Sequence, residues 1–294
     1  MTKIGKVGFI GLGTMGWRMA TRLREAGYDL LAYNRTLAKR ELFAAEGGQV
    51  ANSGAEVSRQ AEVLFSSLSM PKDVEEVYLG GDGILAHVQP GTICVDLTTV
   101  GLDTSRKVYK EATERGVSYL DAPVSGGPEG AEAGTLTIMV GGDKKAFEQV
   151  QPLLSVLGKN VQHLGESGLG SAAKLFNQYL VAVHSLAAAE VMAGAAKLGM
   201  DQKQLYNLLR TSYGYSKMLE RHLEQFVFMD NFEPGGAMKY LLKDLRLSNR
   251  LIAEAGVEPG SGKVAEKVLE SALNDGWGEK DMSGIIRWVE EKWK

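Results

Sequence analysis

A glycine pattern near the N-terminus, Gly11–Gly16 (G-L-G-T-M-G), limits the possible folds more than any other feature of this chain. It follows the apolar run Val7–Ile10 and precedes a helical pattern from Trp17 to Ala26. Glycines spaced in this way allow a tight turn, backbone approach to a pyrophosphate, and close helix–strand packing, while the helix N-terminus offers amide donors. The pattern therefore predicts a dinucleotide-binding turn. Its predicted contacts are Gly11, Leu12, Gly13, Thr14, Met15 and Gly16.

The remaining pattern predicts two domains, as does the length of 294 residues at about 150 residues per domain. Short β-type runs alternate with helical patterns up to about residue 163, which is typical of a parallel sheet with crossover helices. We expect an α/β Rossmann-type domain over 1–164, then an all-α domain over 165–294, joined by a linker at Gly165–Gly170. The predicted strands are Val7–Ile10, Leu30–Tyr33, Val63–Ser66, Ile93–Leu97, Ser118–Ala122 and Leu136–Val140. The predicted helices are Ser171–Leu198, Asp201–Thr211, Ala237–Ala255, Gly262–Asn274 and a segment from Lys280.

The end of the second predicted strand indicates which cofactor is bound. An NAD site places Asp or Glu there, whereas this strand ends in Asn34, Arg35 and Thr36, followed by Arg40. An acid would repel a 2′-phosphate, so we expect NADP(H), with NAD(H) possible. The alternative is that Arg35 is a surface residue or stacks on adenine.

Two later loops, each following a predicted strand, also face the cofactor in an open α/β sheet. Ser66–Pro71 and Leu97–Thr99 fall where loops line the nicotinamide end. We therefore expect Met70 and Thr99 to contact the cofactor.

The composition excludes several other classes of partner. The net charge is −3, so no overall field favours nucleic acid or an anionic membrane. The single cysteine, Cys94, permits no disulfide within the chain, which fits a reducing cytoplasm.

Tyr179–Ala196 is apolar but contains His184 and Glu190, so we predict a buried helix and no membrane span. Since this helix is apolar on more than one face, we predict a homodimer or homotetramer. No metal site is predicted.

The segment Gly168–Gln178 is a candidate catalytic site at the start of a long predicted helix. Helical spacing places Asn177 and Gln178 on the same face as Lys174. A cation near a helix N-terminus is unfavourable, which argues against a merely solvated lysine. We interpret Lys174 as a proton donor oriented by two amides.

Four motifs in order along the chain resemble those of the β-hydroxyacid dehydrogenases, which include 3-hydroxyisobutyrate dehydrogenase, tartronate semialdehyde reductase and the glyoxylate/succinic semialdehyde reductases. The motifs are Gly8–Gly16, Asp121–Gly127 (D-A-P-V-S-G-G), Gly168–Gln178 and Lys243–Leu245.

The resemblance implies a role for each matching residue. Ser125, Gly126 and Gly127 match the segment that binds the substrate carboxylate and adjoining hydroxyl. Lys174 matches the catalytic general acid and base. Asn177 and Gln178 match the substrate-binding amides that follow it. Thr99 matches a hydroxyl residue near the nicotinamide, and Lys243 matches a lysine that contacts the cofactor. The implied reaction is hydride transfer between NAD(P)(H) and a small carboxylate-bearing hydroxy acid, aldehyde acid or keto acid.

The chain also departs from the family pattern. Many relatives carry Asn-Asn where this chain has Asn177-Gln178, and the longer Gln178 resembles the threonate-type branch. Gly236 stands where the semialdehyde reductases have an aromatic residue near the substrate. These differences leave the substrate open, including a longer polyhydroxy acid.

Two other functions remain as alternatives: an imine reductase-like NADPH enzyme, and a noncatalytic dinucleotide-binding assembly module. Imine reductases usually carry Asp or Tyr in place of Lys174, and noncatalytic relatives have lost the lysine. Lys174, together with Ser125–Gly127, therefore favours the dehydrogenase.

Overall fold

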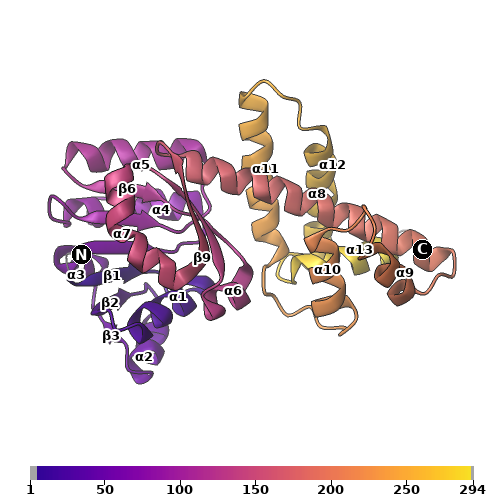
Figure 1. The fold of residues 1–294 in the computed structure, drawn as a ribbon, viewed down its shortest axis with the longest axis horizontal. Coiled ribbons are helices and arrows are strands. Elements are labelled where there is room, and N and C mark those ends of the chain that lie inside the picture. Colours follow the sequence, from indigo (N-terminus) through magenta and orange to yellow (C-terminus); the bar gives the residue numbers. More distant parts are fainter. Residues whose placement is uncertain (1–4, 293–294) are drawn as a thin grey trace. The chain divides into compact units, whose positions relative to one another are not determined.

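The computed structural model describes residues 5–292 and shows two compact units that divide between Lys174 and Leu175. The first unit is an α/β domain and the second is helical (Figure 1). This confirms the predicted fold class.

The first unit is built on one sheet, whose strands within residues 5–292 follow the order β3-β2-β1-β4-β5-β6-β8-β7, with β9 also paired to β8. The pairs from β3 through β6 are parallel, whereas β8 runs antiparallel to β6 and β7. The strands are β1 (Val7–Ile10), β2 (Leu30–Tyr33), β3 (Gln49–Val50), β4 (Val63–Ser66), β5 (Ile93–Asp96), β6 (Ser118–Asp121), β7 (Val124–Ser125), β8 (Leu136–Gly141) and β9 (Gly158–Gly165).

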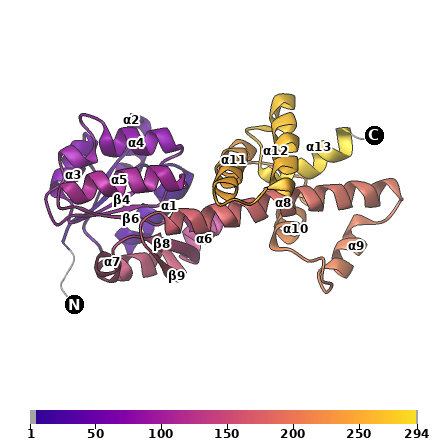
Figure 2. The ribbon, with the colours of Figure 1, turned by 90° about the horizontal axis from the view of Figure 1, so that it is seen from above.

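Helices cover both faces of this sheet (Figure 2). Alternate residues of each central strand face opposite sides, so Phe9 and Phe65 share one core with α1, α6 and α7, whereas Leu64 and Cys94 pack with α3, α4 and α5. The central strands β1, β4 and β5 are mostly apolar because both of their faces are buried. The helices are α1 (Thr14–Glu25), α2 (Leu37–Ala45), α3 (Gly54–Gln60), α4 (Pro71–Leu79), the short η1 (Ile84–Ala86), α5 (Leu102–Glu114), α6 (Gly127–Ala133) and α7 (Lys144–Leu157).

The six predicted strands all form, at β1, β2, β4, β5, β6 and β8, with ends that agree to within one residue. Three strands escaped prediction. β3 and β7 have two residues each, and β9 is largely polar and exposed. These three strands are stabilised by hydrogen bonding to neighbouring strands and have no apolar run of their own, so no local sequence pattern predicts them.

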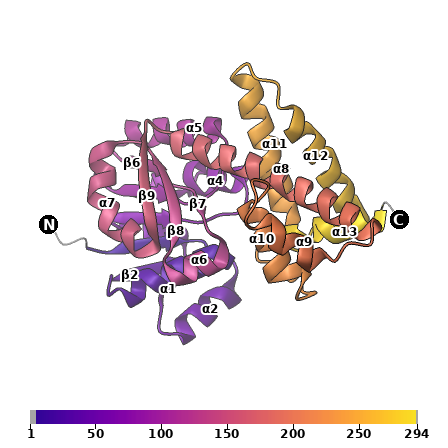
Figure 3. The same ribbon diagram turned by 45° about the vertical axis from the view of Figure 1, so that its right-hand side comes forward.

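The long helix α8 runs through the second unit beside its other helices (Figure 3). Ala182, Leu186, Ala189 and Met192 of this helix belong to the single core of the unit. The helices are α8 (Leu169–Lys197), α9 (Gln202–Leu209), α10 (Lys217–His222), η2 (Leu223–Val227), α11 (Met238–Glu254), α12 (Gly260–Ala272), η3 (Leu273–Trp277), η4 (Met282–Gly284) and α13 (Ile285–Lys292). The five predicted helices are confirmed, whereas α10 and η2 were not predicted. One helix in residues 5–292, α8, is long and apolar enough to cross a membrane, as core helices of soluble proteins also are.

The predicted linker at Gly165–Gly170 is reduced in the structure to a short connection, residues 166–168. β9 ends at Gly165 and α8 begins at Leu169, so the segment is shared between a strand and a helix. Residues 165–174, which the sequence assigns to the second domain, belong to the first unit. The reason is that backbone N–H groups at the start of α8 are bound by Asp121 of β6, a contact that glycine content does not reveal.

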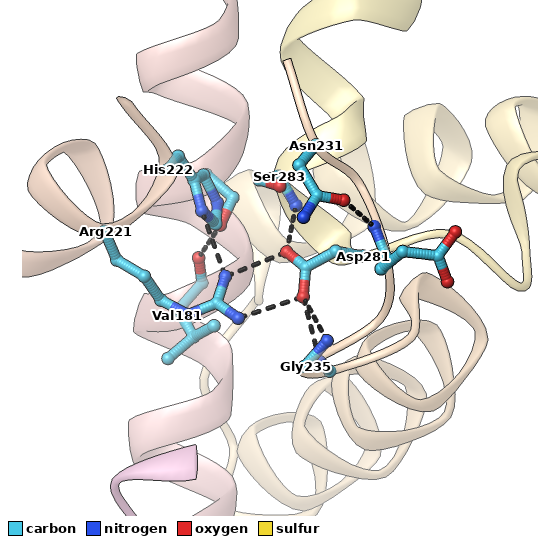
Figure 4. Close-up of polar contacts among 10 residues, drawn as sticks. Val181, Arg221, His222, Asn231, Gly235, Asp281 and Ser283 are labelled. Carbon is cyan, nitrogen blue, oxygen red and sulfur yellow. Dashed lines mark hydrogen bonds and ion pairs between the residues drawn. The ribbon is translucent and has the colours of Figure 1, made fainter. Parts of the chain in front are cut away.

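A buried polar cluster joins α8, α10 and the segment before α13 in the second unit (Figure 4). Both carboxylate oxygens of the fully buried Asp281 accept hydrogen bonds from the Arg221 guanidinium, at 2.9 Å each. His222 Nε2 lies 2.8 Å from Ser185 Oγ, whose proton is donated to Val181 O. His222 Nε2 must therefore be the donor. Arg221 Nη1, itself a donor, faces Nδ1, so the imidazole is neutral.

Burial, and then the Arg221 charge, lower the pKa of His222 from its ordinary 6.5 to about 3. Below pH 6.5 the unfolded chain therefore takes up a proton at His222 that the folded chain does not. The free energy of unfolding decreases as the pH is lowered from 7 toward 3. We expect His222→Gln to flatten this dependence. Between pH 7 and pH 5 the free energy of unfolding of the wild type should fall by about 2 kcal/mol more than that of the variant. Urea unfolding at pH 7, 6 and 5 measures it. Asp96, which titrates in the same range, is present in both proteins and cancels. His87→Gln, outside the cluster, serves as the control. Equal pH dependence in wild type and His222→Gln would contradict this account.

Candidate functional site

The predicted cofactor residues other than Lys243 lie in the first unit, near one edge of its sheet. β2, β1, β4 and β5 are adjacent and parallel, so Gly11, Asn34, Ser67 and Leu97 all follow carboxyl ends of strands. Ligands of open α/β sheets bind outside this edge.

The glycine turn after β1 fits a bound pyrophosphate. A Cβ on Gly16 would lie 1.9 Å from Gly11 O, so the start of α1 packs directly on the turn. A Cβ on Gly13 would meet nothing within 4 Å, which leaves open space beside the backbone. Gly13 caps α1 without a side-chain hydrogen bond, and the first turn of α1 holds no acid. The amides there are available to an anion, and a nearby carboxylate does not oppose it.

The residues after β2 divide into two groups. Asn34 Oδ1 accepts a hydrogen bond from Leu12 N at 2.9 Å, so this side chain braces the glycine turn. Arg40 is bound to Ala51 O and Asn52 O. Arg35 and Thr36 are exposed, and the Arg35 guanidinium makes no hydrogen bond or ion pair to the residues between 5 and 292. Arg35 is thus the cation at this strand end that is available to a phosphate.

The loops after β4 and β5 are organised by a buried carboxylate, Asp96. Its Oδ1 accepts hydrogen bonds from Ser66 Oγ at 2.7 Å and Thr98 Oγ1 at 2.6 Å, and Thr98 Oγ1 in turn accepts from Leu68 N at 2.9 Å. Burial raises the pKa of Asp96 to about 6, against hydrogen bonds from Thr98 and Ser66 that favour the carboxylate. The network joins the two loops that hold the predicted contacts Met70 and Thr99, and both of these residues are half-buried.

The predicted carboxylate-binding segment forms the turn between β7 and α6. Ser125 ends β7 and is half-buried, and Gly126 and Gly127 are exposed. Backbone N–H groups of exposed glycines can approach a carboxylate closely.

Lys174 is buried, with 7% of its surface exposed, in the second turn of α8. The start of this helix is held by Asp121 at the end of β6: Oδ1 accepts from Gly168 N at 2.7 Å and Oδ2 accepts from Ser171 N at 2.8 Å. Burial raises the pKa of Asp121, and the two backbone bonds oppose this rise. Since β6 is parallel to β5, the helix that carries Lys174 begins at the same sheet edge as the cofactor residues.

Three further predicted residues come together in the second unit. Gln178 Nε2 donates to Asp244 Oδ2 at 2.7 Å, and Gln178 Oε1 accepts from Asn177 Nδ2 at 3.0 Å. Lys243 Nζ lies 2.8 Å from Asp244 Oδ1. Asp244 thus orients both the amide pair and the lysine.

Sequence reasoning assigned no role to Asp96 or Asp121, although both are buried and each makes several hydrogen bonds at the site edge. A local signal does exist, because each is an acid at the end of an apolar predicted strand. A buried acid requires partners. The nearby sequence does not show which residues these partners are, because the Gly168 amide that Asp121 binds lies 47 residues away in the sequence.

Comparison with known proteins finds two family models that together match most of the chain. The family described as the NAD binding domain of 6-phosphogluconate dehydrogenase matches residues 6–165. The family described as NAD-binding of NADP-dependent 3-hydroxyisobutyrate dehydrogenase matches residues 168–289.

Individual relatives extend over nearly the whole chain. It is 36% identical to 2-(hydroxymethyl)glutarate dehydrogenase of Eubacterium barkeri, over 99% of this chain and 97% of the relative. It is 38% identical to NAD-dependent L-serine dehydrogenase of Pseudomonas aeruginosa, over 95% and 96%. The solved structure of Mycobacterium tuberculosis 3-hydroxyisobutyrate dehydrogenase with L-serine has a TM-score of 0.89 at 29% identity, covering 98% of this chain and 99% of that one. The chain therefore belongs to the β-hydroxyacid dehydrogenase family and is an NAD(P)-dependent oxidoreductase.

Proposed function

We propose that this enzyme interconverts a small hydroxy acid and its aldehyde or keto acid, with Lys174 as the general acid and base. The observation that carries the proposal is the buried position of Lys174 on a helix that begins at the cofactor edge of the sheet. When bound, the nicotinamide supplies or accepts a hydride. Lys174 Nζ donates a proton to the developing alkoxide oxygen during reduction and accepts it during oxidation.

The Ser125–Gly127 turn is proposed to hold the substrate carboxylate. A half-buried hydroxyl next to two exposed glycine amides provides donors for an anion without a countercharge. Asn177 and Gln178 are proposed to contact the substrate. Their side-chain amides bond to each other, and Gln178 also donates to Asp244, but each amide can make further hydrogen bonds. The relatives named above are dehydrogenases, which does not favour the imine reductase or the noncatalytic alternative.

A substrate panel tests the reaction class. We expect glyoxylate and the semialdehydes of succinate, tartronate and methylmalonate to include substrates with kcat/KM at least tenfold above that of propionaldehyde, because only the acids engage the Ser125–Gly127 donors. Oxidation of 3-hydroxyisobutyrate, L-serine and longer sugar acids extends the panel. If kcat/KM for propionaldehyde equalled that for the aldehyde acids, Ser125–Gly127 would not be the carboxylate-binding turn. Reduction of cyclic imines alone would support the imine reductase instead.

Replacing Lys174 tests its role. We expect Lys174→Ala to lower kcat by about 10²–10⁴, the range for loss of a general acid, with little change in the Kd for NADPH. Lys174→Arg should not restore turnover, since a guanidinium holds its proton. Lys197→Ala, at the other end of the same helix, is the control and should behave as wild type. Near-normal turnover of Lys174→Arg would make Lys174 an electrostatic anchor and not the proton source.

NADP(H) is the proposed preferred cofactor, with NAD(H) possible. The support is the absence of an acid at the end of β2 and the exposed Arg35 beside it. Asn34, which accepts a hydrogen bond from the glycine turn, is uncharged, so no carboxylate at this position repels a 2′-phosphate.

Arg35→Ala tests this preference. A charge-assisted hydrogen bond to the 2′-phosphate is worth about 1.5–3 kcal/mol, so the variant should bind NADPH roughly 10- to 150-fold more weakly and NADH unchanged. Lys39→Ala removes a cation from the following helix and should leave the ratio of the two affinities intact. Wild-type kcat/KM for NADH equal to or above that for NADPH would count against the preference.

A symmetric dimer or tetramer formed through the second unit is also proposed. Phe176, Leu180 and Val191 are each about half exposed, at 48%, 52% and 48%, and lie within about 60° of one another around α8 at 100° per residue. Covering this apolar stripe with a second copy would remove it from water. A cytoplasmic location is proposed from the lone, buried and unpaired Cys94.

A further inference from the structure

We propose that Asp121 is a positioning residue for Lys174: by capping α8 from the end of β6, it sets where the lysine lies relative to the Ser125–Gly127 turn. This inference rests on the proposed function, because it assumes that Lys174 carries the proton.

The cap is bidentate and buried. Asp121 is 1% exposed, and each of its carboxylate oxygens accepts one backbone N–H from the start of α8, Gly168 at 2.7 Å and Ser171 at 2.8 Å. Ser167 Oγ also donates to Oδ1, at 3.4 Å. Two bonds from one planar group fix both the position of the helix start and its rotation.

The helix start has no room to move toward the sheet. A Cβ on Gly170 would lie 2.3 Å from Met139 O and 2.5 Å from Asp121 O, so the backbone of α8 rests on the ends of β8 and β6. From the other side, Ser105 Oγ of α5 lies 2.8 Å from Ser171 Oγ.

This anchor links the two candidate parts of the substrate site. Lys174 lies three residues, less than one helical turn, after the anchored Ser171, and Ser125 lies four residues after Asp121 along the chain. Misplacement of a catalytic group by 1 Å can cost about 10²-fold in rate. A shift in the capped helix start would therefore appear in kcat.

Asp121→Asn is the sharpest test because it preserves size and removes one acceptor. An amide has one oxygen and one NH2 group, so its NH2 must face a backbone N–H of α8. We expect kcat to fall about 10- to 100-fold and the Kd for NADPH to stay within about twofold. The amides in the first two turns of α8 should exchange with deuterium at least about tenfold faster.

Asp143→Asn is the matched control. Asp143 caps α7 in the same unit by accepting from Ala146 N at 2.8 Å, and α7 carries no candidate site residue. We expect a lower Tm but an unchanged kcat and unchanged exchange in α8. Should Asp121→Asn fail to fold, Ser105→Ala, which removes the partner of Ser171, should give a several-fold lower kcat and faster exchange in the same turns.

A double-mutant cycle separates positioning from a general structural effect. In a Lys174→Met background, Asp121→Asn should leave the residual kcat unchanged, since the group that it positions is gone. The same fold-loss with and without Lys174, or unchanged exchange in α8, would overturn the proposal. Failure of the proposed function is visible separately, as full turnover of the single variants Lys174→Ala and Lys174→Arg, and the exchange measurement needs no substrate.

Discussion

Burial of both faces of the central sheet is the constraint on which the first unit depends. A strand covered by helices on both sides has no room for polar side chains, so chemistry is confined to the ends of the strands. The carboxyl edge is where this unit places its polar groups. The two buried acids Asp96 and Asp121 end adjacent strands and are paired in register. Each then binds groups from loops or helices that are distant in the sequence.

The two acids do different work at that edge. Asp96 joins the loops after β4 and β5 through Ser66 and Thr98, whereas Asp121 binds backbone N–H groups at the start of α8. Removing a carboxylate from water is costly unless hydrogen bonds replace those lost to solvent. The raised pKa of both groups shows that burial outweighs the hydrogen bonds they accept. Groups with perturbed pKa values are concentrated at functional sites, which agrees with the place of both acids at the candidate site.

The second unit repeats this use of a buried acid within a helical core. Asp244 accepts from Gln178 and pairs with Lys243, and Asp281 receives both guanidinium donors of Arg221 together with the backbone N–H of Gly236. Leaving either carboxylate without its cation would strand a buried charge. Both units therefore place polar side chains by anchoring them to a carboxylate held among apolar residues.

Local sequence determined six of the strands, the long helices and the glycine turn, because apolar runs, helical periodicity and G-x-G-x-x-G act over a few residues. The role of Lys174 was predicted from its place at the start of the long helix and again from motif resemblance, whereas that of Ser125–Gly127 came from resemblance alone, and both stay predictions. Only the tertiary structure decided the pairing of β3, β7 and β9, the start of α8 in place of a linker, and the partners of Asp121. Those features depend on contacts between segments from about a dozen to 50 residues apart, and their stability comes from neighbours in space, which no local pattern encodes.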